Sequence, residues 1–166
     1  SLMPKWPCET RTRPLKQSLK MPSNVVRPSP HLSWAELACR DGTPYPEAWE
    51  DRARFLAAVF EEFRAALGGD PITIGSAYRT PTWNRRCGGS ARSQHLYGRA
   101  LDCYPPTAMF LATFRERAKA FAIEDDRIGG FGSYRWGVHI DIRPRGSRLI
   151  VWNQVPADTR LHDRLA

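Results

Sequence analysis

The chain has 166 residues, of which 42% are hydrophobic, and its 25 basic side chains outnumber 17 acidic ones to give a formal net charge of +8. This length fits one domain, the apolar content excludes a globally disordered chain, and no run approaches the ~20 apolar residues that a membrane-spanning helix needs. A basic protein is attracted to polyanions such as nucleic acid, anionic membranes or bacterial wall polymers, and charge alone does not decide among them.

The first segment predicts a basic, proline-rich arm or tail over 1–30, followed by one domain over 31–166. Residues 1–33 hold six basic side chains, one acidic side chain and six prolines, without helical or strand periodicity. The segment also lacks the apolar core of a signal peptide. We therefore expect synthesis in the cytoplasm, with Met3 as the native start.

The four cysteines lack the Cys-x-x-Cys spacing of a zinc finger or redox motif. Cytoplasmic synthesis keeps thiols reduced. We therefore expect no disulfide framework, and Cys39, Cys87 and Cys103 are predicted to be buried, inert thiols.

The first predicted element after the arm is a helix that begins at Ser33, because Ser33 and Glu36 have the spacing of a capping box. A turn-rich break over 41–46 follows. Apolar residues then recur at three- and four-residue steps over 49–67 and stop at a pair of glycines, which predicts an amphipathic helix. A β-branched run predicts a short strand over 71–74.

The second half begins with 80–94, where proline, asparagine, glycine and serine predict a loop. A helix is expected over 107–122, then strands over 127–135, 137–143 and 149–152. The glycines between the first two of these strands indicate a tight, irregular hairpin. Helices and antiparallel strands are segregated along the chain, so the predicted class is α+β.

Two of the four histidines have neighbours that could build a site. In an extended strand, alternation places His139, Asp141 and Arg143 on one face and aliphatic residues in the core. His95 and Asp102 are separated by a glycine that lets the chain turn, so they could converge on the same point. Two imidazoles and one carboxylate with an open fourth position are a common donor set for catalytic zinc, which acidifies its bound water and polarises a carbonyl.

A simpler interpretation of these histidines stays open. His95 would then cap a loop, and His139 would be a hydrogen-bonded core residue. His31 and His162 have no comparable neighbours, and we expect both to be ordinary surface residues.

Three segments resemble a known family. SQHLYGRALD over 93–102 is similar to the S-x-H-x-x-G-x-A-x-D signature of the zinc D-Ala-D-Ala carboxypeptidase family, which includes phage L-alanyl-D-glutamate endopeptidases. ITIGSAYRTPTWN over 72–84 resembles the family's I-x-S-G-Y-R-[ST]-P-x-x-N segment, with Ala77 where glycine is usual. WGVHID over 136–141 resembles its last zinc-ligand strand, and HLSWAELAC more weakly resembles the lead-in of the phage-type members. The resemblance covers 31–145.

The resemblance implies a Hedgehog/DD-peptidase-like fold, with a small antiparallel sheet and flanking helices. It implies that zinc is the cofactor and that His95, Asp102 and His139 are its ligands. Arg79 matches the family arginine that faces the substrate, where a guanidinium stabilises the developing oxyanion or binds a substrate carboxylate.

Roles for three further residues are weaker expectations. Ser93 and Gln94 would orient the loop or touch the substrate. Asp141 would hold a ligand histidine in its metal-binding tautomer or serve as the general base. Many members carry an acid as base three residues before the last histidine, where this chain has Trp136. Asp141, or a carboxylate such as Asp125 or Asp126, would then have to take that role.

The expected function is zinc-dependent hydrolysis of an amide bond in peptidoglycan peptide stems, by D,D- or L,D-peptidase action at the cell wall. The missing signal peptide favours a phage or prophage lysin or a virion component. A non-cleaving, metal-bound module that binds wall peptides or a protein is the alternative, favoured by Trp136. A nucleic-acid-binding protein is a weaker rival that rests on the net charge and on the arginines at 85, 86, 92 and 99.

Overall fold

The structure, a computed structural model, describes residues 26–155; most of the predicted arm, Cys8 and His162 lie outside the described residues. The elements in chain order are α1 (Trp34–Leu37), the 3-10 helix η1 (Glu47–Trp49), α2 (Glu50–Ala66), β1 (Thr73–Ser76), α3 (Pro81–Arg86), the 3-10 helix η2 (Gln94–Tyr97), β2 (Ala100–Tyr104), α4 (Leu111–Glu124), β3 (Gly130–Ser133), β4 (Val138–Asp141) and β5 (Ile150–Asn153). Within this described part, no helix is long and apolar enough to cross a membrane.

The strands form one sheet in the order β1-β2-β4-β3-β5. The pairs β1–β2, β2–β4 and β3–β4 are antiparallel, but β5 runs parallel to β3. The expectation of a purely antiparallel sheet is therefore wrong at this edge, although the α+β class is confirmed. Gly130 opens β3 and pairs with both Asp141 and Ile150, so the chain leaving β4 passes the start of β3 before it enters β5.

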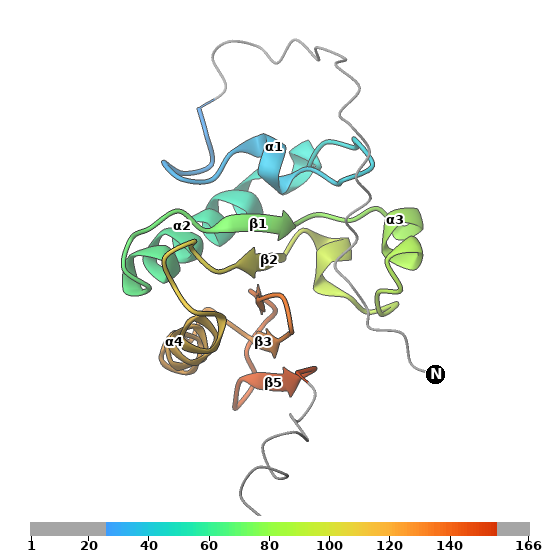
Figure 1. Cartoon of the computed structure of the whole chain (residues 1–166). Coiled ribbons are helices and arrows are strands. Elements are labelled where there is room, and N and C mark those ends of the chain that lie inside the picture. Colours follow the sequence, from blue (N-terminus) through green and yellow to red (C-terminus); the bar gives the residue numbers. More distant parts are fainter. Residues whose placement is uncertain (1–25, 156–166) are drawn as a thin grey trace, which may run out of the picture.

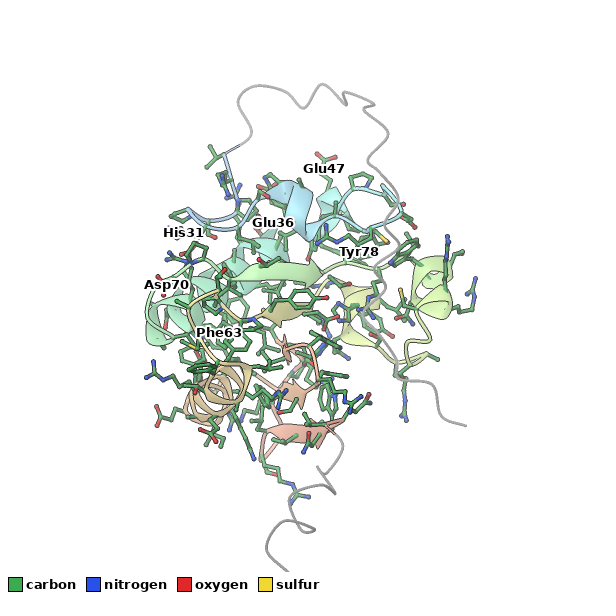
Figure 2. All side chains as sticks on the ribbon, viewed as in Figure 1. His31, Glu36, Glu47, Phe63, Asp70 and Tyr78 are labelled. Atoms are coloured by element: carbon green, nitrogen blue, oxygen red, sulfur yellow. The ribbon has the colours of Figure 1, made fainter. Side chains whose placement is uncertain are left out.

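The core lies between the sheet and the two long helices, which Figure 1 shows together at the left of the strands. Leu101 of β2 and Ile140 of β4 are buried on this side. Phe63 of α2, labelled in Figure 2, packs edge-on against Phe114 and Phe121 of α4, with ring centroids 6.3 and 5.6 Å apart. Burial of aromatic rings of this size dominates the energetics of a small core, so this packing fixes the sheet that carries the site.

The long helices and the four predicted strands are confirmed with shifted ends. The capping box at Ser33 and Glu36 is present, although α1 ends after a single turn. The predicted loop over 80–94 is wrong in part, because it contains α3 and the first residue of η2. Thr80 accepts a hydrogen bond from the Trp83 backbone N–H and Pro81 occupies the first turn, an N-terminal signal that the surrounding loop-like composition masked.

Strand β2 was not predicted at all. Four of its five residues are buried, so its side chains show none of the polar-apolar alternation that identifies a half-exposed strand. Cys39 and Cys103 are buried free thiols as expected, whereas Cys87 is only half-buried. It lies after α3, at the edge of a cavity on the opposite side of the sheet from the long helices.

Candidate metal centre

A cavity of about 670 Å³ is lined by the segment after α3, by η2 and by residues of β2, β4 and β5. Figure 1 shows α3 at the right of the strands, beyond the end of β1 and away from α2 and α4. Arg79, Ser93, Gln94, His95, Asp102 and His139 all line this cavity. The structure therefore brings together six of the seven predicted site residues; Asp141 lies directly behind them.

His95 is held by η2, which ends at Gly98 in the left-handed conformation with φ of 61°. A side chain at Gly98 would also collide with Tyr45, whose hydroxyl donates to the Gly98 carbonyl. The Nδ1 atom of His95 lies 2.5 Å from the Ala77 carbonyl oxygen. Because a carbonyl only accepts, Nδ1 carries the hydrogen and Nε2 keeps its lone pair.

The second histidine, His139, and the carboxylate of Asp102 lie opposite each other on two adjacent strands. Asp102 of β2 and His139 of β4 are direct antiparallel partners. Asp102 Oδ1 lies 2.9 Å from His139 Nδ1 and 3.1 Å from His95 Nε2. The three side chains are almost fully buried, and the two imidazole rings meet edge to face with centroids 4.9 Å apart.

Asp141 lies two residues beyond His139 on the same strand face, as the alternation predicted. Its Oδ2 atom lies 2.9 Å from His139 Nε2. Arg143 donates to both carboxylate oxygens through its guanidinium, and its backbone N–H donates to Oδ1. The carboxyl group fits because position 130 is glycine, where a Cβ would overlap it. Asp141 is fully buried and does not line the cavity.

The hydrogen bonds of the two histidines leave three side-chain atoms free to act as metal ligands. His95 Nδ1 and His139 Nε2 are directed to oxygen acceptors, so His95 Nε2 and His139 Nδ1 point lone pairs at a carboxylate oxygen. One ligand atom from each of the three residues lies within 4.8 Å of the other two. Lone pairs that converge in a buried space repel one another unless a proton or a metal ion lies between them. Two imidazoles and a carboxylate fit zinc, which prefers such ligands.

Protonation differs between the two imidazoles. Burial is the main cause that lowers the pKa of His95. Burial also opposes a charge on His139, but its hydrogen bonds to Asp102 and Asp141 outweigh that cost and raise its pKa to about 8. The pKa of Asp102 is lowered despite burial, because the two imidazoles stabilise its charge. In the metal-free protein, a proton on His139 therefore takes the place that a cation would fill.

Arg79 is buried beside the carboxylate. Its Nη2 donates to Asp102 Oδ2 at 2.5 Å and its Nε donates to Ser76 Oγ at 2.8 Å. Because Arg79 occupies Oδ2, the Oδ1 atom of Asp102 faces the two histidines. A substrate-facing role for Arg79 stays a prediction, supported by its position in the cavity wall.

The loop that carries Ser93 and Gln94 is anchored by Asn84, for which no role was predicted. Asn84, the last residue of the 72–84 motif, is buried and donates through Nδ2 to the Ser90 carbonyl at 2.9 Å. Gln94 Oε1 is buried without a hydrogen-bond partner among the described residues. That acceptor is available to a ligand N–H, and substrate contact by Ser93 and Gln94 stays a prediction.

Other carboxylates considered as a base lie elsewhere. Asp125 directly follows α4 and forms an ion pair with Arg127, and neither Asp125 nor Asp126 lines the cavity. Tyr134 and Trp152 do line it, and sequence reasoning missed both. Only the alternation along β3 and β5 could have indicated them, because these residues share a face with His139.

Comparison with known proteins agrees with this geometry. Residues 30–141, which include the cavity residues up to β4, match the peptidase M15 family. A zinc D-Ala-D-Ala carboxypeptidase from Streptomyces albus G is 40% identical over 53 residues, which is 31% of this chain. The match spans only about a fifth of that relative, 21% of its length. The family match covers well over half of the chain and contains the complete His-Asp-His group, so the chain belongs to the peptidase M15 family.

Proposed function

We propose that the protein is a zinc-dependent peptidase that hydrolyses an amide bond in peptidoglycan peptide stems, with D,D- or L,D-specificity. The observation that carries this proposal is the convergence of His95, Asp102 and His139 on one buried point that opens into a cavity. Membership of a peptidase family and the similarity to a zinc D-Ala-D-Ala carboxypeptidase supply the reaction class. A phage or prophage lysin is the role that the phage-type motif at 31–39 supports.

In this proposal His95 Nε2, Asp102 Oδ1 and His139 Nδ1 hold the zinc ion. A bound zinc ion polarises a carbonyl and lowers the pKa of a water molecule. The chain's own residues hold the ligands in place: Asp141 accepts the His139 Nε2–H, and Arg79 fixes Asp102 Oδ2. The remaining N–H groups of Arg79 are available to the reacting carbonyl oxygen or to a substrate carboxylate.

Incubation of purified peptidoglycan with the protein, with and without a chelator, tests the proposal. Mass spectrometry of the products is expected to show new peptide termini that disappear with the chelator. The termini identify the bond that is cleaved. Absence of products from several wall chemotypes, with zinc confirmed bound, would contradict peptidase action.

The alternative of a non-cleaving, metal-bound module has one observation in its favour. Among the described residues that line the cavity, Asp102 is the only carboxylate, and Trp136 lines the wall where many family members carry an acid. This module would bind wall peptides or a protein in a zinc-dependent manner and release no product. The same incubation, combined with calorimetric titration of wall peptides, separates the two functions.

Zinc affinity is expected to rise with pH. The pKa of His139 in the metal-free protein is about 8, and a ligand imidazole must be deprotonated, so zinc displaces one proton below that pH. The apparent affinity therefore increases by about tenfold per pH unit between pH 6 and 8 and levels off above it. The His139 proton stabilises the metal-free fold below pH 6.5, and this contribution is lost as the pH rises through 8.

A competition titration against a chromogenic chelator, corrected for the chelator's own protonation, measures this dependence. An affinity that is constant from pH 6 to 8 would show that zinc binding releases no proton in this range and would contradict the raised pKa of His139.

A further inference from the structure

The cavity contains a hydrogen-bond donor that the family motifs do not include. Tyr134 follows β3 and lines the cavity with Arg79, Asp102 and His139. Asp141 is enclosed by its own partners, and two donor positions of Arg79 are engaged by Asp102 and Ser76. The free part of Arg79 and the hydroxyl of Tyr134 are therefore two donors in this cavity for a substrate carbonyl that gains charge.

The backbone explains why Tyr134 faces the site. Residues alternate between the two faces of a strand, so Gly130, Gly132 and Tyr134 share the face of His139, the cross-strand partner of Gly132. A Cβ at Gly132 would overlap the Trp152 indole. The two glycines therefore leave room for neighbouring side chains, and Tyr134 contributes the next side chain on this face.

Trp152 of β5 fills the space above Gly132 and connects the phenol to the metal centre. Its ring centroid lies 5.2 Å from that of His139. Its indole Nε1 donates to the Tyr134 hydroxyl oxygen at 2.8 Å. An indole N–H only donates, so the phenol oxygen accepts here and its own hydrogen must point elsewhere. Among residues 26–155, no protein acceptor takes that hydrogen.

The electrostatic environment keeps the phenol protonated. Burial is the main cause that raises the pKa of Tyr134, and it outweighs the hydrogen bond from Trp152, which lowers that pKa. The charges of Asp102 and Asp141 raise the pKa further, against the opposing charge of Arg79. At neutral pH the group is a donor and not a phenolate.

We propose that Tyr134 is a catalytic residue that donates its phenolic hydrogen bond to the oxygen of the scissile carbonyl as that oxygen gains negative charge, with the Trp152 indole orienting the phenol. This inference rests on the proposed peptidase function. A pre-oriented donor of this kind acts more strongly on the tetrahedral transition state than on the planar substrate. It acts beside Arg79, which lines the same cavity, and transfers no proton.

Tyr134→Phe tests the inference, because it removes the hydroxyl and keeps the ring that stacks on Trp136 at 4.8 Å. Loss of one oxyanion donor is expected to lower kcat about 10²- to 10³-fold, with KM and zinc affinity unchanged. Trp152→Phe, which loses only the orienting N–H, is expected to give a smaller loss. Tyr97→Phe is the matched control, since Tyr97 is exposed and does not line the cavity.

A second measurement does not depend on turnover. A phosphinate analogue of the cleaved dipeptide, which has a tetrahedral centre, is expected to bind Tyr134→Phe at least ~10-fold more weakly than wild type. The product peptide, whose terminal carboxylate is planar, should bind wild type and Tyr134→Phe equally. Full activity of Tyr134→Phe, or a loss of zinc that accounts for its defect, overturns the role of Tyr134. A wild type that cleaves no wall peptide overturns the proposed function and this inference with it.

Discussion

Replacement of His139 by alanine is expected to lower zinc affinity about 10²- to 10³-fold and to abolish peptide hydrolysis. A four-ligand zinc site is worth about 10–16 kcal/mol, so one ligand contributes about 2.5–4 kcal/mol. The substitution also removes the group that lies between the Asp102 and Asp141 carboxylates. Zinc content after dialysis against a metal buffer measures the first effect, and product analysis measures the second.

His31→Ala is the matched control. His31 is an exposed histidine, as the sequence predicted, and its Nδ1 pairs with Glu61 at 2.7 Å beside α2. Figure 2 shows it at the outer surface of the molecule. This variant is expected to retain both zinc and activity. Thermal unfolding of the metal-free His139→Ala protein shows whether its loss of zinc follows from unfolding. Unchanged zinc content in a folded His139→Ala protein would contradict the ligand assignment.

Asp141→Asn is expected to weaken zinc binding, because both oxygens of this buried carboxylate accept hydrogen bonds. His139 Nε2 and Arg143 Nη2 face Oδ2, while the Arg143 Nε and backbone N–H face Oδ1. Whichever way the asparagine amide turns, its NH₂ group faces a donor. Loss of a partner that orients a metal-bound histidine costs about 10- to 100-fold in metal affinity. The partly buried ion pair with Arg143 is also lost.

The metal dependence of this variant separates the two roles considered for Asp141. If Asp141 positions His139, Asp141→Asn binds zinc weakly, and saturating zinc restores most of its turnover. If Asp141 is the general base, the variant keeps its zinc and stays inactive at any zinc concentration. The complete burial of Asp141 and its separation from the cavity favour the first outcome. Zinc titration followed by hydrolysis assays distinguishes them.

The sequence predicted much of the fold because most elements have local signals. The apolar period over 49–67 and the glycine pair after it identified α2, and alternation over 137–143 placed His139 and Asp141 on one face. Strand β2 had no such signal, because four of its five residues are buried and tertiary packing decides its conformation. The parallel pairing of β5 with β3 depends on the path of a connecting segment, which local pattern does not reveal.

The site shows the same division. Motif spacing identified the three candidate ligands, and the structure brings them together. Local spacing could not show that Arg79 pairs with Asp102, because the two residues come from separate segments of the chain. It also could not show that Asp141 is enclosed behind His139, because that depends on burial in the folded protein. Tyr134, which follows β3, and Trp152 of β5 meet only after the sheet forms. Sequence reasoning therefore finds the metal centre more readily than the cavity wall around it.

The most direct test of the metal centre is a crystal structure of the zinc-loaded protein, with anomalous data collected on both sides of the zinc absorption edge. We expect one anomalous peak among His95 Nε2, His139 Nδ1 and Asp102 Oδ1, with His139 Nε2 still directed to Asp141. A peak at another group of residues, or zinc bound through His139 Nε2, would contradict the account.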